Sequence, residues 1–411
     1  MHPNRMRWLD YWVGRPLCWA LTMWSRVMGL WRGGSRRSTS GEPPRNILII
    51  ELAEMGSTVV AYPALQHLRA RHPECRLFFL VFTALRDSVK VLDVAPDAQI
   101  WTIDPSSVST LLGDTIRFVR SARRAGIDTA INLEMFARFS TMLAYVSGAS
   151  TRIGFDPFTQ KGLYCGDLFT HRVPYNPHLH TWQSFVALVQ ALDAPHGELP
   201  VGKIPASAPA ARQLLQVSSD PVLRARLWEV LERALPAVRG KRLIAINPNA
   251  SKLIAIRKWP RERYAELTRR LLDDPETACV ITGVASEHED AAFIRNHVQS
   301  DRVLDLTGKT SLRELRELFT MVDLLVTNDS GPAHFAALTR VRTIVFFGPE
   351  TPDLYRPLSD RCTVLYANYA CSPCVSAYNQ RLSPCSDNRC LTHFSVDEVY
   401  ATAMAAMDER A

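Results

Sequence analysis

The fold is decided by residues 323–334, DLLVTNDSGPAH, in which a short apolar run ends in a polar loop. The run at 323–327 has the length and the Leu and Val content of a strand that is buried on both faces of a parallel sheet. Pro332 suits the first position of a helix, with Ser330 or Gly331 before it at the cap. The stretch therefore predicts a strand, a short loop and a helix that begins at about residue 332.

Apolar runs of strand length recur on both sides of this stretch and alternate with helical patterns. In the second half, strands are expected at 243–246, 278–282, 302–306, 323–327 and 343–347, with helices at 261–273, 287–298, 311–320 and 332–339. In the first half, strands are expected at 47–50, 77–82, 98–103 and 127–133, with helices at 58–72, 84–93, 109–125 and 135–147. Such alternation predicts a doubly wound α/β sheet in each half.

The chain is long enough for two such domains, because its 411 residues compare with roughly 150–200 for one domain. The expected divisions are a Trp- and Arg-rich segment with a linker at 1–45, a first domain at 46–196, an interdomain connection at 197–240, a second domain at 241–394 and a terminal helix at 395–411. We expect an α/β architecture of two Rossmann-like domains that face each other across a cleft. Ligands are expected at the carboxyl ends of the strands.

The positive charge of the chain is concentrated at its N-terminus. The formal net charge is +7, and residues 1–46 alone carry eight arginines and two acids. A nucleic-acid binder would usually carry its basic patch on a folded domain, so no nucleic-acid partner is expected. Five of the nine tryptophans lie within residues 8–31. Trp and Arg together suit the lipid headgroup layer, and this favours an amphipathic helix lying on the anionic inner face of the cytoplasmic membrane.

The alternative for this N-terminal segment is a helix packed on the body of the protein or on a second subunit. No apolar run in the sequence approaches the roughly 20 residues of a spanning helix, so a polytopic membrane protein is not expected. No cleavable signal sequence is evident, and the expected location is the reducing cytoplasm.

Four of the nine cysteines form a cluster near the C-terminus, at Cys371, Cys374, Cys385 and Cys390. In a reducing compartment such a cluster suggests a metal site or free thiols rather than disulfides. Four thiolates close a tetrahedral site and leave no open coordination position. The cluster therefore predicts a structural zinc or iron ion, with free thiols as the alternative.

Two strand-end loops of the second half suit a diphosphate. The free amides that open the helix at 332, together with its dipole, suit an anion, and Asp329 and His334 lie beside them. The loop after the strand at 243–246 leads to Arg257 and Lys258, two cations that suit a departing diphosphate. Glu287, after the strand at 278–282, suits the hydroxyls of a ribose, with a capping carboxylate as the alternative.

These loops, together with LTGKTSL at 306–312 and MGSTVVAYPAL at 55–65, resemble glycosyltransferase family 9, the ADP-heptose lipopolysaccharide heptosyltransferases. The resemblance runs over about 47–400 and is strongest at 304–349. It implies a GT-B fold, a nucleotide-sugar donor on the second domain, an acceptor on the first domain, and catalysis without a metal or other cofactor.

The implied activity is that of an inverting glycosyltransferase that moves a sugar, expected to be heptose from ADP-heptose, to a lipopolysaccharide-type or other lipid-linked saccharide. The alternative is a non-catalytic protein of the same fold that binds nucleotide sugars or serves in assembly. A sugar-nucleotide epimerase is a weaker third interpretation, because the motifs match the transferase family in order.

The resemblance also assigns site residues by motif. Arg257 takes the place of the family's phosphate-binding lysine, and Glu287 matches its ribose-binding acid. The implied donor-binding residues are Asn249, Ser251, Arg257, Lys258, Glu287, Asp329, Ser330, Gly331 and His334. The implied acceptor-side loop contains Gly56, Ser57 and Thr58.

The first loop departs from the family at one position. The family carries an Asp, taken as the catalytic base, where this chain has Ser57. A serine is no base at neutral pH without a partner. Glu54 lies three residues away in the same loop, and Glu134 follows the strand at 127–133. We predict Glu54 as the catalytic carboxylate, with Glu134 as the second candidate.

Overall fold

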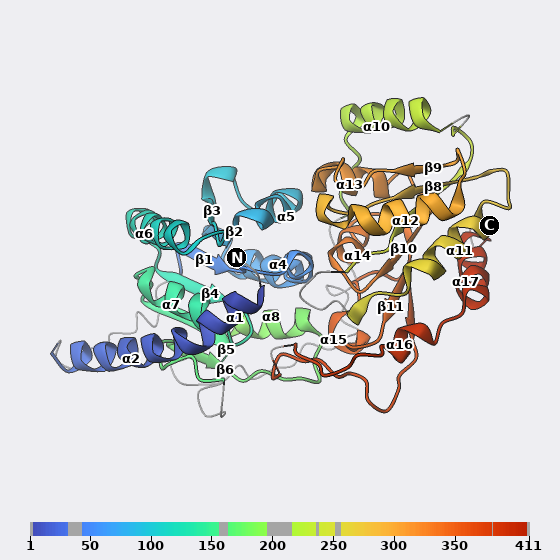
Figure 1. The fold of residues 1–411 in the computed structure, drawn as a ribbon. Helices are drawn as coiled ribbons and strands as arrows, with labels where there is room; N and C mark the ends of the chain where they lie inside the picture. The colour runs from blue at the N-terminus through green and yellow to red at the C-terminus, as the bar shows by residue number, and fades with distance from the viewer. Residues whose placement is uncertain are drawn as a thin grey trace. The chain divides into compact units, whose positions relative to one another are not determined.

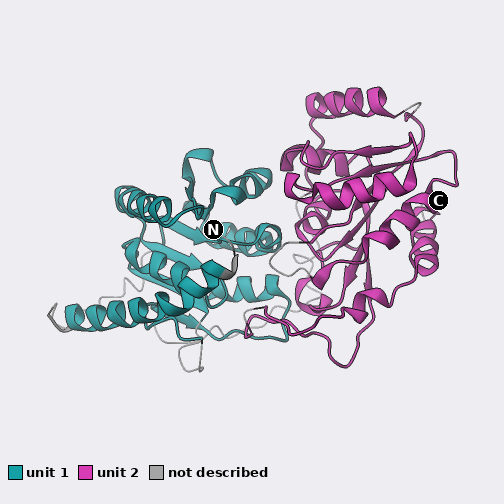
Figure 2. Cartoon of the chain, in the orientation of Figure 1, with its two compact units in different colours: residues 1–208 teal, residues 209–411 magenta. Residues whose placement is uncertain are grey.

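The structure, a computed structural model, describes residues 3–31, 43–155, 163–194, 216–235, 238–250, 256–379 and 381–408. The chain divides into two compact units, residues 1–208 and residues 209–411 (Figure 2). Each unit is built on a six-stranded parallel sheet with helices on its faces (Figure 1). The expected α/β class with two doubly wound sheets is thereby confirmed.

The sheet of unit 1 has the order β3-β2-β1-β4-β5-β6. Its strands are β1 (Asn46–Ile50), β2 (Arg76–Phe82), β3 (Ile100–Ile103), β4 (Thr129–Asn132), β5 (Thr151–Phe155) and β6 (His171–Val173). Strand β1 lies between β2 and β4, with Ile47 in register with Leu77 on one side and Thr129 on the other. Four of the five β1 residues are buried, which explains why this strand has no polar face.

The helices of unit 1 are α1 (Pro3–Trp12), α2 (Gly14–Trp31), α3 (Met55–Val60), α4 (Tyr62–Arg71), α5 (Arg86–Leu92), α6 (Val108–Ala125), α7 (Arg138–Val146) and α8 (Thr181–Gln190). Helix α6 shows how the sequence sets such bounds. The Ser107 side chain accepts a hydrogen bond from the Thr110 amide at its start, and Gly126 ends it with a φ of 63°.

The sheet of unit 2 has the order β12-β11-β10-β7-β8-β9. Its strands are β7 (Arg242–Asn247), β8 (Thr277–Ile281), β9 (Val303–Asp305), β10 (Leu324–Asn328), β11 (Arg342–Phe347) and β12 (Cys362–Tyr366). Read from β9, the order within the unit is 3-2-1-4-5-6, the same as in unit 1. In this topology the strand order reverses between the first and fourth strands, and ligands bind there. The binding edge is therefore expected beside β1 and β4 in unit 1, and beside β7 and β10 in unit 2.

The helices of unit 2 are α10 (Pro221–Ala234), α11 (Arg261–Leu271), α12 (His288–Val298), α13 (Leu312–Phe319), α14 (Gly331–Ala336), α15 (Pro352–Tyr355), α16 (Arg389–Thr392) and α17 (Val396–Asp408). The fully buried Trp259 anchors the core on one face of the sheet. Its ring stacks on Phe346 at 4.7 Å between centroids and meets Tyr264 edge-on at 4.9 Å. This contact fixes the segment that enters α11 directly after Arg257 and Lys258.

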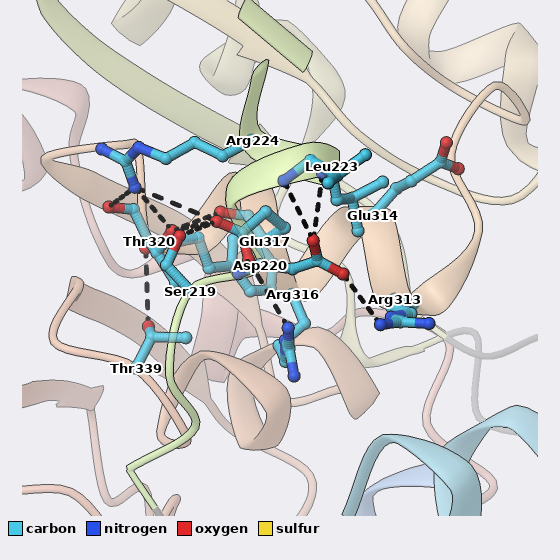
Figure 3. Close-up of polar contacts among 12 residues, drawn as sticks. Ser219, Asp220, Leu223, Arg224, Arg313, Glu314, Arg316, Glu317, Thr320 and Thr339 are labelled. Carbon is cyan, nitrogen blue, oxygen red and sulfur yellow. Dashed lines mark hydrogen bonds and ion pairs between the residues drawn. The ribbon is translucent and has the colours of Figure 1, made fainter. Parts of the chain in front are cut away.

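Helix α10 is held to unit 2 by a buried carboxylate on α13 (Figure 3). Glu317 is fully buried and accepts hydrogen bonds from the Asp220 amide at 2.9 Å, the Thr320 hydroxyl at 3.0 Å and the Ser219 hydroxyl. Asp220 in turn accepts bonds from the amides of Val222 and Leu223 and so caps α10. The segment that was expected to connect the domains therefore ends in a helix that belongs to unit 2.

The observed elements also correct some expected bounds. The helix expected at 332–339 is α14, which is only six residues long. The N-terminal segment that was expected to form one helix forms two, α1 and α2, with a break at Val13. Strands β5, β6 and β12 and helix α8 had no prediction. In the expected connection at 197–240, residues 197–215 and 236–237 lie outside the described residues.

Candidate functional site

The loops after β7 and β10 meet at the reversal point of the unit 2 sheet. Thr327 of β10 is in register with Asn247 of β7, so the two loops leave the same edge side by side. Asn328 locks them together, because its side-chain amide donates to the carbonyls of Pro248 at 2.9 Å and Asn249 at 3.2 Å. Its side-chain oxygen accepts from the Trp259 amide at 2.8 Å. One fully buried asparagine thus fixes three segments that carry candidate donor-binding residues.

Arg257 is the cation at this edge. Its NH1 atom lies 3.0 Å from Asp329 Oδ2, and the two side chains are only 12% and 6% exposed. The same NH1 atom lies 4.0 Å from Glu350 Oε2. Sequence reasoning therefore placed Arg257 and Asp329 correctly together at one edge. It missed Glu350, which comes directly after the stretch 304–349 where the family resemblance is strongest.

Several polar atoms near this edge are buried and have no hydrogen-bond partner among the described residues. They include Arg257 Nε, His334 Nδ1, Asn249 Nδ2, Thr307 Oγ1 and Glu350 Oε1. A buried polar group without a partner costs about 1–3 kcal/mol, so several at one edge indicate a polar ligand that supplies the missing partners.

The absence of a side chain at Gly283 allows Asn249, Thr307 and Glu287 to lie close together. A Cβ atom on Gly283 would lie 2.9 Å from Glu287 Oε2 and 3.3 Å from both Asn249 Nδ2 and Thr307 Cγ2. Three candidate side chains from different loops therefore surround one glycine, and a side chain here would push them apart.

Burial sets the protonation of the other groups at this edge. It lowers the pKa of His334, together with the neighbouring charge of Arg257, to about 4, so the imidazole is neutral at pH 7. Burial raises the pKa of Asp329 above its ordinary value, against the attraction of Arg257. A neutral His334 offers one N–H donor and one acceptor to a ligand.

The remaining donor-side candidates make contacts within the protein. Lys258 Nζ lies 2.7 Å from Asp290 Oδ2 and donates to Asn249 Oδ1 at 3.2 Å, so it also holds Asn249. Glu287 accepts a hydrogen bond from the Val284 amide at 2.9 Å, which is the capping contact expected as the alternative to ribose binding. Ser251 lies outside the described residues.

Helix α14 contributes less positive potential than its motif suggested. It spans only Gly331–Ala336, and the Ser330 hydroxyl donates to the Asn328 carbonyl at 3.1 Å instead of serving the helix amides. A macrodipole needs several turns of aligned peptide units. The positive charge for an anion at this edge therefore comes mainly from Arg257. Gly331 can contribute only its backbone groups.

In unit 1, Glu134 holds the first loop. Its Oε1 atom accepts hydrogen bonds from the amides of Leu52 at 2.6 Å and Ala53 at 2.8 Å. Burial raises the pKa of the Glu134 carboxyl above its ordinary value, against the opposing effect of these two amides. Glu54 follows directly and occupies the N-cap of α3, where its side chain makes no cap hydrogen bond in the described structure. The two predicted catalytic carboxylates therefore lie on neighbouring loops at the reversal point of this sheet.

The acceptor-side residues predicted in the first turn of α3 differ in exposure. Gly56 and Ser57 are half-buried. Thr58 is buried, and its hydroxyl donates to the Met55 carbonyl at 2.7 Å. This contact indicates that the Thr58 side chain supports the loop.

Phe136, on the loop that also carries Glu134, was not a candidate from the sequence. It has a φ of 62°, the left-handed region that bulky residues rarely adopt, in the loop between Glu134 and α7. Its buried ring meets Tyr175 edge-on at 5.5 Å. Strain of this kind persists only where the surroundings fix the backbone, and it often marks functional loops.

The N-terminal helices α1 and α2, together called the hairpin here, pack on α7. Ala137 at the N-cap of α7 has no side chain that could accept a hydrogen bond, and Asp10 of α1 takes this role. Asp10 Oδ1 accepts from the Phe139 amide at 2.9 Å, and Oδ2 pairs with Arg138 NH1 at 3.1 Å. Arg138 is 1% exposed, so the hairpin covers a buried guanidinium and completes α7.

Helix α2 is buried on its small and polar side. Gly14, Cys18, Thr22 and Ser25 are buried, at a spacing of three or four residues. The large apolar side chains point outward. Exposed fractions are 57% for Trp8, 61% for Trp12 and 59% for both Trp19 and Trp24. The predicted helix therefore packs on the protein body with one face and leaves its tryptophan face open. No helix among the described residues is long and apolar enough to cross a membrane.

The predicted metal site is not supported. Among the described residues, no group of three or more His, Cys, Asp or Glu side chains is placed to hold a metal ion. The cysteines do not form disulfides, and Cys374 Sγ accepts a hydrogen bond from the Ser383 hydroxyl at 3.2 Å. Cys390 is buried against Gly348, where a Cβ atom would lie 2.7 Å from its sulfur. The spacing of Cys371, Cys374, Cys385 and Cys390 thus suggested a tetrahedral site that their side chains do not form.

Solved structures share the fold over nearly the whole chain. The E. coli ADP-heptose lipopolysaccharide heptosyltransferase II matches with a TM-score of 0.67 and 20% identity, over 89% of this chain and 100% of that chain. A glycosyltransferase family 9 protein from Veillonella parvula matches with a TM-score of 0.68 and 18% identity, over 90% and 99% of the two chains. These identities establish the two-domain fold alone.

The sequence is similar to curated heptosyltransferases. It is 24% identical over 325 residues to lipooligosaccharide heptosyltransferase 2 of Haemophilus influenzae, covering 78% of this chain and 88% of the relative. It is 25% identical over 168 residues to the Campylobacter jejuni enzyme of that name, covering 40% of this chain and 50% of the relative. The chain thus spans about half the length of the Campylobacter relative it matches.

The family model for glycosyltransferase family 9 (heptosyltransferase) matches residues 115–383. This range takes in the loops after β4, β7 and β10, which carry Glu134, Arg257 and Asp329. Because the match covers more than half of the sequence, the chain belongs to glycosyltransferase family 9.

Proposed function

We propose that the chain is an inverting glycosyltransferase that moves heptose from ADP-heptose to a lipopolysaccharide-type acceptor. The observation that carries the proposal is the set of buried, unpartnered polar atoms around Arg257 at the reversal point of unit 2. Further support comes from relatives named lipooligosaccharide or lipopolysaccharide heptosyltransferase 2, and from an E. coli heptosyltransferase of the same fold solved with ADP-2-deoxy-2-fluoro heptose.

On the donor side, Arg257 is proposed to hold the diphosphate. When the bond from the sugar to the diphosphate breaks, negative charge builds on the departing oxygen, and fixed donors stabilise it most in a buried site. Arg257 Nε and Asn249 Nδ2 are buried donors that no described residue satisfies. We propose that these groups provide the stabilisation without a divalent metal ion.

On the acceptor side, Glu54 is proposed to take the proton from the attacking hydroxyl. The hydroxyl oxygen then attacks the anomeric carbon from the face opposite the diphosphate, which inverts the configuration. Glu134 is proposed as a positioning residue, because both of its amide contacts lie in the two residues directly before Glu54.

The test is ADP binding followed by transfer. ADP at a hundredfold excess over its Kd is expected to stabilise the protein by about 2.7 kcal/mol and raise the melting temperature by roughly 5–10 °C. ADP-heptose with lipopolysaccharide that lacks heptose is expected to yield ADP and a heavier saccharide by mass spectrometry. Absence of ADP binding contradicts the donor site. ADP-heptose binding without any transfer favours the non-catalytic alternative.

We also propose that the outer face of the hairpin lies on an anionic membrane, on the cytoplasmic side. Support comes from Trp8, Trp12, Trp19 and Trp24, each more than half exposed on α1 and α2. The acid of these helices, Asp10, is turned inward to Arg138, so the outer face carries no described carboxylate. Exposed Trp with flanking Arg is the composition that the headgroup layer favours.

Replacing Trp19 and Trp24 with serine is expected to weaken binding to mixed phosphatidylcholine–phosphatidylglycerol vesicles by at least about tenfold for each tryptophan. Flotation with the full chain measures this, and high salt is expected to weaken binding further. Val222→Ser, at an 81% exposed apolar position on α10, is the matched control and is expected to have no effect. Equal flotation of all variants, or none by the unaltered protein, contradicts a membrane role for this face.

A further inference from the structure

Glu350 lies directly after β11, and its side chain is only 2% exposed. Its Oε2 atom is 4.0 Å from Arg257 NH1, and its Oε1 atom is 3.5 Å from Arg381 Nε. Asp329 contacts the same Arg257 NH1 atom at 3.0 Å. One guanidinium at the proposed diphosphate site therefore lies between two buried carboxylates, of which sequence motifs accounted for only one.

The charges described around Glu350 cancel when every group is ionised. Arg257 and Arg381 are the cations, Asp329 and Glu350 are the anions, and His334 nearby is neutral. Tyr355 also belongs to the described surroundings, since the Arg381 guanidinium lies 5.5 Å from the centre of its ring. A site with no net charge attracts a diphosphate poorly. A carboxylate 4 Å from a phosphate oxygen would repel it by about 4 kcal/mol at an effective dielectric of 20.

Protonation of one carboxylate removes its repulsion of the diphosphate and leaves the site with a net positive charge. Burial raises the pKa of Glu350, Arg257 opposes this and the charge of Asp329 adds to it, with a net pKa of about 8. A neutral Glu350 leaves Arg257 with one carboxylate partner and gives the cluster a charge of +1 to meet the ligand. Near pH 7 Glu350 then carries a proton, and above pH 8 it does not.

We infer that Glu350, which shares Arg257 with Asp329, is a further residue of the donor site, and that the site binds the nucleoside diphosphate with Glu350 protonated and takes up a proton from solvent when Glu350 is ionised beforehand. The inference rests on the proposed donor site. Binding transfers one proton from buffer to a carboxylate oxygen of Glu350, and no other bond changes. Protonated Glu350 is the binding form, so affinity is full below pH 8. The Kd then rises by up to about tenfold per pH unit above it.

Isothermal titration calorimetry with ADP at pH 8.5, in two buffers of different ionisation enthalpy, counts the protons taken up. ADP itself is fully deprotonated there, because the last pKa of a phosphate is near 6. The unaltered chain is expected to take up more than about half a proton. Glu350→Gln, which imitates the protonated acid, is expected to bind ADP without proton uptake and with a Kd that stays constant from pH 7 to 9.

Two further variants sharpen the result. Glu398→Gln, an exposed acid on α17, is the matched control and is expected to retain the uptake. Glu350→Asp keeps a carboxyl group and is expected to retain it as well. Uptake that persists in Glu350→Gln, or loss of ADP binding in that variant, overturns the inference. Failure of the unaltered chain to bind ADP contradicts the proposed function instead, and the inference falls with it.

Discussion

Replacing Glu54 with glutamine is expected to lower the rate of heptose transfer by about 10²–10⁴, the usual contribution of a general base. Glutamine has the same shape as glutamate but cannot accept the proton of the acceptor hydroxyl. The donor site lies in the other unit and is untouched, so the Kd for ADP is expected to stay unchanged. Initial rates of ADP release with lipopolysaccharide as acceptor, paired with ADP calorimetry, measure both quantities.

The controls separate the roles of the two carboxylates. Glu74→Gln, at an exposed position of the same unit, is expected to have the normal rate. Glu134→Gln keeps an oxygen that accepts from the Leu52 and Ala53 amides, so it is expected to retain most activity, whereas Glu134→Ala loses both hydrogen bonds. Normal turnover in Glu54→Gln with an inactive Glu134→Gln would exchange the two assignments.

The second large effect is expected at Arg257. Arg257→Ala removes the buried cation that is proposed to face the departing diphosphate, and kcat/KM for ADP-heptose is expected to fall by about 10²–10³. The change also leaves Asp329 and Glu350 buried without their shared partner. Loss of one partner of a buried pair costs about 3–5 kcal/mol, so the melting temperature is expected to fall as well.

Arg257→Lys separates these two consequences, because lysine keeps the charge but not the planar fork of donors. It is expected to restore the melting temperature more fully than the rate. Arg295→Ala, at an exposed position on α12, is the control and is expected to alter neither quantity. A chain with Arg257→Ala that binds ADP as tightly as the unaltered protein would place the diphosphate elsewhere.

The sequence predicted both sheets because buried parallel strands are continuous apolar runs, as at 47–50 and 243–246. It also placed Arg257 and Asp329 together, because both follow strands that are neighbours in this topology. Glu350 could not be found in this way. Its contact with Arg257 spans 93 positions of the chain and depends on how the turn after β11 packs, which no local pattern encodes.

The hairpin shows a different limit. The composition of α1 and α2 indicated a surface helix with exposed Trp and Arg, but it did not show which face would pack on the protein. In the structure the small, polar face does so, because Asp10 and Thr22 find partners on the protein body at Phe139 and Asp167. The cysteine spacing failed for a related reason, since spacing constrains reach along the chain but not the direction of four thiols.

The inward polar face of α2 has a practical consequence for the preparation of this protein. Deleting the residues before β1 would expose the Arg138 guanidinium. It would also remove the Asp10 carboxylate, which accepts a hydrogen bond from an amide in the first turn of α7. Exchanging the outward tryptophans for hydrophilic residues keeps both contacts, because none of those rings takes part in them. Substitution of the exposed tryptophans is therefore expected to preserve the fold of unit 1 better than deletion of α1 and α2.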